Sequence, residues 1–255
     1  MTDTILWPDT PFDLQSRLIL VGRRGSEAHG TYIPSEDPTS VDDRDLMGIV
    51  IPPAKYYIGL SEWKHAEAIK ECWDVVLYEY RKFVGLLMNQ NPNVLGMLWL
   101  EPEDYLLTSK QSNILIENRN LFRARRKAAS SFMGYATSQL YKMEHMAFKG
   151  YMGDKRKKLV EKHGYDTKNA AHLVRLLHMG TEFLETGELH VRRTWDRDML
   201  DDIKKGKWAL DAVKKYAVDR MEACRNAELK SDLPDEIDQE AVENIVLDTL
   251  SERFI

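Results

Sequence analysis

The order of secondary-structure patterns along the chain constrains its fold more than any other feature. Strand-like apolar runs occur only in the first 108 residues, near 14–21, 43–51 and 72–77, with one helix expected over 79–89. From residue 109 onward the apolar spacing is helical, which predicts helices near 109–118, 122–148, 168–186, 196–204, 208–229 and 237–252. We therefore expect an α+β fold. A small mixed sheet with flanking helices in residues 1–108 would precede a helical domain in residues 109–255.

The composition excludes several classes of protein. Hydrophobic residues make up 43% and charged residues 30% of the chain, which is typical of a soluble globular protein. No apolar run approaches the roughly 18–20 residues that cross a bilayer, and the first residues lack a secretory signal pattern. Cys72 and Cys224 are too few for a disulfide framework or a zinc cluster. A reducing cytoplasm is the expected setting, without membrane association.

Three aspartates are the strongest candidates for metal binding and catalysis. Asp43 and Asp45 are two residues apart on a predicted strand, so both side chains should point to one face. Two such carboxylates bind a divalent cation readily and repel each other without one. Asp74 on the next strand would be the third, and Mg²⁺ commonly binds carboxylates together with substrate phosphates. A register shifted by one would select Asp42 instead, but the spacing favours Asp43 and Asp45.

A glycine-rich turn precedes these aspartates. Gly25 lets the backbone approach a phosphate, and the hydroxyl of Ser26 can donate a hydrogen bond to it. A segment rich in Pro, Ser and Asp, residues 32–42, follows and should form a loop. The informative feature is the order of these pieces: an apolar run, Gly-Ser, a loop, Asp-x-Asp on a strand, and Asp on another strand.

This combination resembles a known family. The segments GSEAHG (25–30), DRDLMGIVI (43–51), WDVVLYEYRKFVGLLMNQNPNVLGMLW (73–99) and KNAAHLVRLLHMGTEFLETGELHVRR (168–193) are similar to predicted nucleotidyltransferases of the YcgL/RlaP type, in the DNA polymerase β superfamily. The resemblance spans about residues 17–210. It implies that Asp43, Asp45 and Asp74 hold Mg²⁺ or Mn²⁺, and that Gly25 and Ser26 contact an NTP. Ser26 and Asp43 are farther apart than in compact members, which makes the loop 32–42 either a specificity element or a sign of drift.

The helical part offers further candidates for nucleotide binding. Lys168, His172 and Arg175 fall on one face of a predicted helix, where they could bind the β- and γ-phosphates. The alternative is an ordinary solvated face with a hydrogen-bonded histidine. The resembled family carries similar Lys and His residues on this helix, which favours phosphate binding.

Residues 119–168 are rich in Lys and Arg, although the chain has a net charge of -5. Such a region suggests a phosphate-binding surface, or simply solvated helix faces. Basic residues interleaved with aromatics can bind single-stranded nucleic acid, whereas aromatics at helical spacing can equally be core. The residues concerned are Phe122, Arg123, Arg125, Arg126, Lys127, Phe132, Tyr135 and Tyr141. The run of residues 155–158 is expected to be a solvated loop or helix end.

The expected reaction is transfer of a nucleoside monophosphate from an NTP to a hydroxyl, with release of pyrophosphate. An RNA 3′ end is the first choice of acceptor, because of the basic region and the likeness to RNA-repair proteins. A protein hydroxyl is the closest rival, and a nucleotide-binding regulatory protein without turnover is the third alternative. The sequence leaves the choice of NTP and the oligomeric state open.

Overall fold

The computed structural model describes residues 5–34, 42–145 and 154–254. Its centre is a five-stranded sheet in the order β3-β4-β2-β1-β5. The strands β2 and β4 pair in parallel and the remaining neighbours are antiparallel. The strands are β1 (Leu18–Arg24), β2 (Arg44–Val50), β3 (His65–Lys70), β4 (Trp73–Glu79) and β5 (Tyr105–Thr108). This mixed sheet with helices confirms the predicted α+β class.

The predicted helices of the second part are present with small shifts at their ends. They correspond to α5 (Lys110–Glu117), α6 (Arg125–His145), α8 (Thr167–Thr186), α9 (Arg197–Lys204), α10 (Leu210–Lys230) and α11 (Gln239–Phe254). The end of the predicted helix 122–148 lies outside the described residues. Gly187 ends α8 with a φ of 74°, a left-handed conformation that favours glycine. Among the described helices, none is both long and apolar enough to cross a membrane.

Shorter elements complete the chain. They are α1 (Gly25–Ala28), α2 (Lys55–Ile58), α3 (Tyr80–Met88), α4 (Pro92–Leu95), α7 (Asp154–His163) and three turns of 3₁₀ helix, η1 (Gly96–Leu98), η2 (Pro102–Asp104) and η3 (Arg119–Phe122). The basic run 155–158 lies within α7. The loop predicted for residues 32–42 falls mostly outside the described residues.

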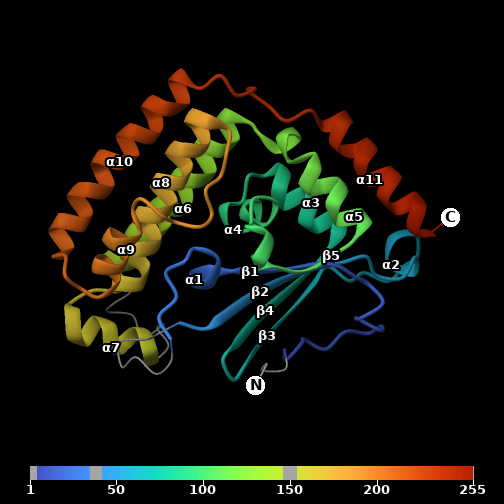
Figure 1. Ribbon diagram of the computed structural model, residues 1–255, viewed down its shortest axis with the longest axis horizontal. Coiled ribbons are helices and arrows are strands. Elements are labelled where there is room, and N and C mark those ends of the chain that lie inside the picture. The colour runs from blue at the N-terminus through green and yellow to red at the C-terminus, as the bar shows by residue number, and fades with distance from the viewer. Residues whose placement is uncertain (1–4, 35–41, 146–153, 255) are drawn as a thin grey trace.

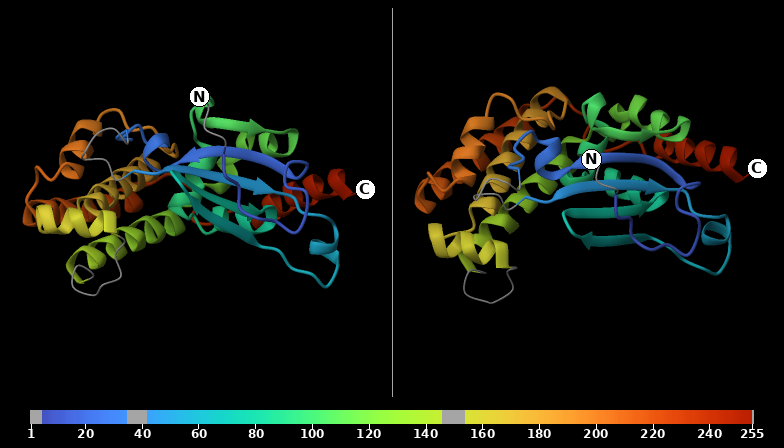
Figure 2. Two further views of the ribbon diagram at one scale, coloured as in Figure 1. Left: turned by 90° about the horizontal axis from the view of Figure 1, so that it is seen from below. Right: turned by 60° about the horizontal axis from the view of Figure 1, so that its bottom comes forward.

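Different segments of the chain pack on the two faces of the sheet. The N-terminal segment packs Trp7, Phe12 and Leu14 against one face, beside Leu46 and Leu77 of the central strands. Helices α3 and α4 contribute to the core on the other face. Figures 1 and 2 show the bundle of α6, α8 and α10 at the end of the sheet where β1 leads into α1, while α11 lies at the opposite end.

One hydrophobic core passes from the sheet into the helical bundle. It joins Val76 of β4 and Phe83 of α3 to Phe132 of α6 and Phe183 of α8. The rings of Phe132 and Phe183 stack with centroids 6.4 Å apart. The junction of sheet and bundle is therefore firmly packed. The division into two domains at residue 108 stays a prediction.

Candidate active site

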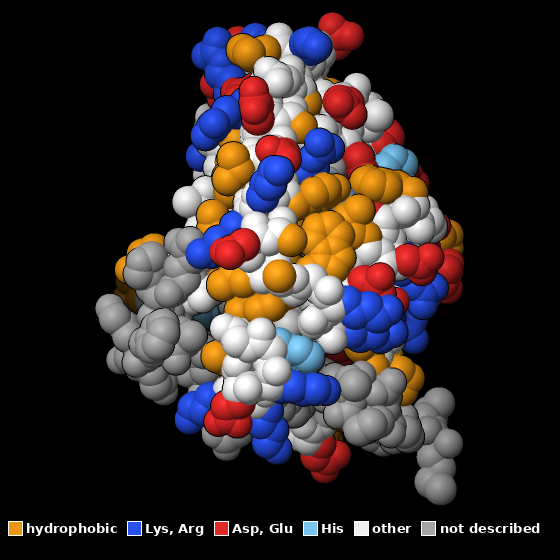
Figure 3. Space-filling model, turned by 90° about the vertical axis from the view of Figure 1, so that its left-hand side faces the viewer, with side chains coloured by type: hydrophobic (Ala, Val, Ile, Leu, Met, Phe, Trp, Pro, Cys, Tyr) orange, Lys and Arg blue, Asp and Glu red, His pale blue; other side chains and the backbone are white. Residues whose placement is uncertain are grey.

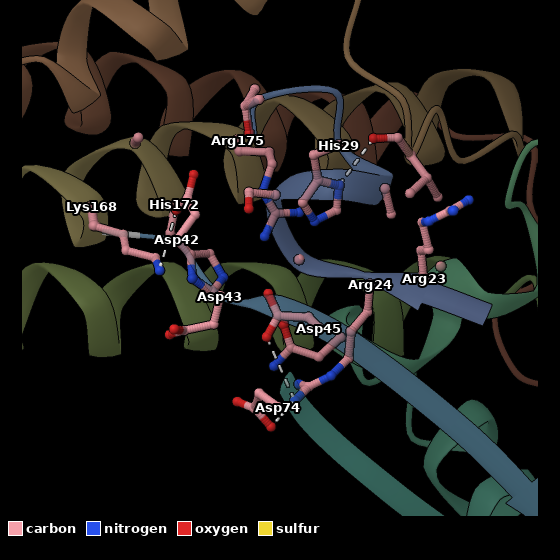
Figure 4. A pocket seen from close by; sticks show the side chains of 18 of the residues that line it. Arg23, Arg24, His29, Asp42, Asp43, Asp45, Asp74, Lys168, His172 and Arg175 are labelled. Carbon is pink, nitrogen blue, oxygen red and sulfur yellow. Dashed lines mark hydrogen bonds and ion pairs between the residues drawn. The ribbon is translucent and has the colours of Figure 1, made fainter. Parts of the chain in front are cut away.

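The register of the sheet places three charged residues in a row. Arg24 of β1 pairs with Asp45 of β2, and Asp45 is level with Asp74 of the parallel strand β4. Directly opposed residues on neighbouring strands project from the same face. We use the name charge row for Arg24, Asp45 and Asp74, which lie side by side at the end of the sheet near the bundle (Figure 4).

The guanidinium of Arg24 lies between the two carboxylates of the charge row. Its Nη2 is 2.7 Å from Asp74 Oδ1 and 3.8 Å from Asp45 Oδ1. Its Nε donates a hydrogen bond of 3.3 Å to the carbonyl oxygen of Leu46. The sequence-based candidates did not include Arg24. The signal for it was its place directly before Gly25, shortly after the apolar run 14–21.

The surroundings of Asp45 disfavour its charged form. Burial, the largest cause, and the nearby carboxylate of Asp74 raise the pKa of Asp45, Arg24 opposes them, and the resulting pKa is about 6. One arginine therefore does not fully compensate the two carboxylates. A cation of higher charge would stabilise the ionised form of Asp45.

Asp43 lies just before β2, not within it. The first ladder bond runs from the backbone N–H of Arg44 to the carbonyl of Cys72, over 2.7 Å. The carboxylate of Asp43 points away from those of Asp45 and Asp74 (Figure 4). The expectation that strand alternation aligns Asp43 with Asp45 is thus corrected, because that alternation holds only inside a strand. The role of Asp43 stays a prediction.

The donor atoms of the charge row suit a divalent cation only in part. In the described part of the chain, no three His, Cys, Asp or Glu side chains are grouped to hold a metal ion. Mg²⁺, however, often uses one or two carboxylates and completes its shell with waters and substrate phosphates. Asp45 and Asp74 supply two such carboxylates on adjacent strands. They fit a substrate-completed site, provided that Arg24 leaves its position between them.

The predicted glycine-serine turn contacts the charge row directly. Gly25 has a φ of +62°, and a Cβ added there would lie 2.6 Å from Asp45 Cγ and closer still to its Oδ2. A side chain at this position would therefore displace the carboxylate. The Oγ of Ser26 is buried and has no hydrogen-bond partner among the described residues. This hydroxyl is free to bind an oxygen of a ligand in the adjoining cavity.

A buried network holds this turn against the helical bundle. The Nδ1 of His29 lies 3.0 Å from the carbonyl oxygen of Val191, and the backbone N–H of Arg193 donates to the carbonyl of His29 over 3.0 Å. The guanidinium of Arg193 is fully buried and forms ion pairs of 2.7 Å with Glu182 and 2.8 Å with Asp196. The segment after α8 thus fixes the position of the turn.

The predicted face of α8 does line the cavity. Arg175 is 9% exposed and forms no ion pair with a described residue; its Nη1 lies 3.1 Å from Met179 Sδ. Burial, with Arg193 nearby, lowers the pKa of Arg175 to about 9. The Nε2 of His172 is buried without a hydrogen-bond partner in the described chain, and burial and Arg175 lower its pKa well below 6.5. This wall therefore favours an anionic ligand.

Lys168 lines the cavity and also forms an ion pair with a buried aspartate. Its Nζ is 3.3 Å from Oδ1 of Asp42, whose Oδ2 accepts hydrogen bonds from Lys204 and from the backbone N–H of Ile33. Asp42 is thus buried in ion pairs with α8 and α9. The ion pair between Lys204 and Asp42 was not predicted from the sequence, because no local pattern marks Lys204.

The candidates from both halves of the chain surround one cavity of about 610 Å³. The lining includes the charge row, Gly25, Ser26 and Asp43, together with Lys168, His172 and Arg175 of α8. The rest of the wall includes apolar side chains: Ile69, Pro92, Met97, Leu100, Met179 and Val191. A volume of this size accommodates a ligand as large as a nucleotide.

In the basic cluster before and within α6, two of the aromatic residues belong to the core. Phe122 and Phe132 are fully buried, which agrees with the core alternative left open by the sequence. Arg123 pairs with Glu188, and Arg125 and Arg126 pair with Asp235. On the end of the molecule seen in Figure 3, basic side chains alternate with acidic and hydrophobic ones. Binding of nucleic acid by the remainder of residues 119–158 stays a prediction.

Comparisons with known proteins place the chain. No curated protein matches it. A solved structure, the nucleotidyltransferase-like protein from Exiguobacterium sibiricum 255-15, is 12% identical with a TM-score of 0.27, over 84% of this chain and 69% of that one. The family model described as RlaP, the RNA repair pathway DNA polymerase beta family, matches residues 13–244. A carboxylate pair, a glycine-serine turn and a basic helix face thus occur together in a chain that belongs to the RNA repair pathway DNA polymerase beta family.

Proposed function

We propose that this protein transfers a nucleoside monophosphate from an NTP to a hydroxyl acceptor and releases pyrophosphate. One observation carries the proposal: two carboxylates and the buried Arg175, which has no ion pair with a described residue, line the same cavity of about 610 Å³. A triphosphate complements this arrangement, since its oxygens suit Arg175 and a cation bound to it suits Asp45 and Asp74.

The carboxylates would act through a metal. Mg²⁺ or Mn²⁺ bound by Asp45 and Asp74, and by Asp43 after a rotation of its side chain, would supply Lewis acidity at the reacting phosphate and its attacking hydroxyl. Asp74 is the more exposed of the two row carboxylates, with 32% of its side chain accessible against 20% for Asp45. We assign Asp74 the uptake of the acceptor's proton, because an accessible carboxylate can exchange it with solvent.

The phosphates would be held by residues from both halves of the chain. Ser26 offers a buried hydroxyl without a partner among described residues, and Arg175 offers a guanidinium whose fork matches two phosphate oxygens. His172 is neutral at pH 7 and can donate a single N–H. Lys168 would divide its charge between Asp42 and the terminal phosphate.

The acceptor that we propose first is an RNA 3′ end, on the strength of the family description. We also propose that residues 1–108 act as the catalytic domain and residues 109–255 as a helical domain. All candidate metal ligands and the Gly-Ser turn come from the first part, and the basic face of α8 comes from the second. The free thiols Cys72 and Cys224 agree with a cytoplasmic setting.

A labelling experiment tests the reaction and its acceptor. The protein is incubated with Mg²⁺ or Mn²⁺, each α-³²P-labelled NTP, total RNA and a cell lysate, beside Asp45→Asn and Asp74→Asn. Asp219→Asn, on the exposed surface of α10, is the matched control. Label in RNA that both active-site variants lose supports the proposal, whereas label in a protein band moves the acceptor to a protein hydroxyl. Metal-dependent NTP binding without pyrophosphate release would instead indicate a regulatory protein.

A further inference from the structure

We propose that, in the free protein, the guanidinium of Arg24 occupies the place of a divalent cation between Asp45 and Asp74. The site therefore binds a divalent metal efficiently only as a complex with a triphosphate. The inference rests on the proposed function, in which Asp45 and Asp74 hold the metal. It goes beyond that function by assigning a role to Arg24 and by naming the bound form of the substrate.

The position of Arg24 is fixed by the fold. Its backbone pairs with Asp45 across β1 and β2, and its side chain contacts Asp74 at 2.7 Å and the carbonyl of Leu46 at 3.3 Å. The guanidinium therefore fills the space where a metal shared by Asp45 and Asp74 would lie. It also explains why two carboxylates can stand level on adjacent strands of the free protein.

A free cation must compete with this arginine. It has to replace the charge-assisted hydrogen bond between Arg24 and Asp74, and until Arg24 moves it is repelled by the guanidinium. Both side chains are partly exposed, 27% for Arg24 and 32% for Asp74, so solvent screens this pair and weakens it. Arg24 should therefore lower the affinity for a free metal without abolishing binding.

A triphosphate offers Arg24 a new partner. Arg24 lines the same cavity as Ser26 and Arg175, the residues proposed to hold phosphate. Because phosphate oxygens accept the guanidinium fork in a bidentate manner, the ligand can draw Arg24 away from Asp74 while its cation takes the vacated place. Arg24 and the two carboxylates thus each have a partner of opposite charge both before and after the ligand binds. Metal and nucleotide should consequently strengthen each other's binding.

Arg23 provides the matched control. It lines the same cavity and carries the same charge, but it donates to the carbonyl of Glu103 over 2.8 Å and lies 3.7 Å from Asp104. Replacing it removes one positive charge from the cavity without touching the charge row. A change specific to Arg24 therefore reflects the position of its guanidinium and not the total charge.

The test measures Mn²⁺ binding directly, by the loss of the free-ion electron paramagnetic resonance signal. Without nucleotide, Arg24→Gln should bind Mn²⁺ about tenfold more tightly than the wild type, a size typical of coupling between neighbouring sites. Arg23→Gln should equal the wild type. With an α,β-methylene NTP that cannot be cleaved, wild-type affinity should rise and the advantage of Arg24→Gln should shrink.

Two kinds of failure can be told apart. If the wild type binds Mn²⁺ but Arg24→Gln binds it no more tightly, or Arg23→Gln gains equally, the role of Arg24 is refuted. If no form binds Mn²⁺, with or without the NTP analogue, the proposed metal site itself fails. Should Arg24→Gln fold poorly by circular dichroism, Arg24→Met gives the same decision. It removes the positive charge, and we expect it to bind Mn²⁺ more tightly than the wild type.

Discussion

Replacing Gly25 by alanine should damage the site far more than it damages the fold. The left-handed φ of +62° costs a residue with a Cβ about 1–2 kcal/mol. The new Cβ would lie 2.6 Å from Asp45 Cγ, and forcing that side chain off its rotamer adds about 1 kcal/mol. For a chain of this size, each kcal/mol lowers Tm by about 2–4 °C, so a drop of roughly 4–12 °C follows. Displacing Asp45 by an ångström should lower kcat/KM about 100-fold.

The assay pairs thermal unfolding with pyrophosphate release. Gly164→Ala is the matched control, because Gly164 also has a positive φ, +81°, but nothing lies within 4 Å of its added Cβ. That variant should show the backbone cost of about 1–2 kcal/mol and keep its activity. If Gly25→Ala retained kcat/KM within threefold of Gly164→Ala, the contact between the turn and Asp45 would have no catalytic importance.

Three further predictions concern the residues around the cavity. Arg193→Met should lower the free energy of unfolding by about 3–5 kcal/mol in urea, because it leaves buried carboxylates unpaired, while the exposed Arg197→Ala should change it by less than about 0.5 kcal/mol. Lys204→Met should lower the free energy of unfolding by about 2–3 kcal/mol, because it removes the buried partner of Asp42. Lys168→Met should lower it by at most about 1 kcal/mol and should instead raise the KM for NTP. A larger loss of stability in Lys168→Met than in Lys204→Met would contradict these roles. Because the folded pKa of His172 lies well below 6.5, the unfolded chain takes up a proton first as pH falls, so stability is lost below pH 6.5. His172→Asn should reduce that loss by about 1 kcal/mol between pH 7.5 and 5.5, and an unchanged pH dependence in urea unfolding would refute it.

Burial decided which strands could be predicted from the sequence. The strands β1, β2 and β4 are buried along most of their length, so they read as apolar runs. The strand β3 is an edge strand with mostly exposed side chains, and Ile69 is 77% exposed. The four-residue β5 forms the other edge. Neither needs an apolar face, which is why both were missed.

In the candidate site, too, local patterns were predictable from the sequence and long-range contacts were not. Helical spacing alone placed Lys168, His172 and Arg175 together, and the structure brings all three to the cavity. The contact between Asp42 and Lys204 joins residues 162 positions apart, so no local pattern could reveal it. Helical spacing likewise could not decide whether Phe132 faced solvent or core.

The charge row depends on alignment of β2 to within one residue. An added Cβ at Gly48, in β2, would lie 2.6 Å from Leu77 Cδ2 and 3.2 Å from Leu18 Cδ2 on the flanking strands. A slip of one position would push a larger neighbour into this crowded spot and would turn Asp45 to the opposite face. Misaligned sheets are therefore penalised by sterics and by charge at once. A long-lived, folded but inactive form should not accumulate, and specific activity should track the fraction of folded protein.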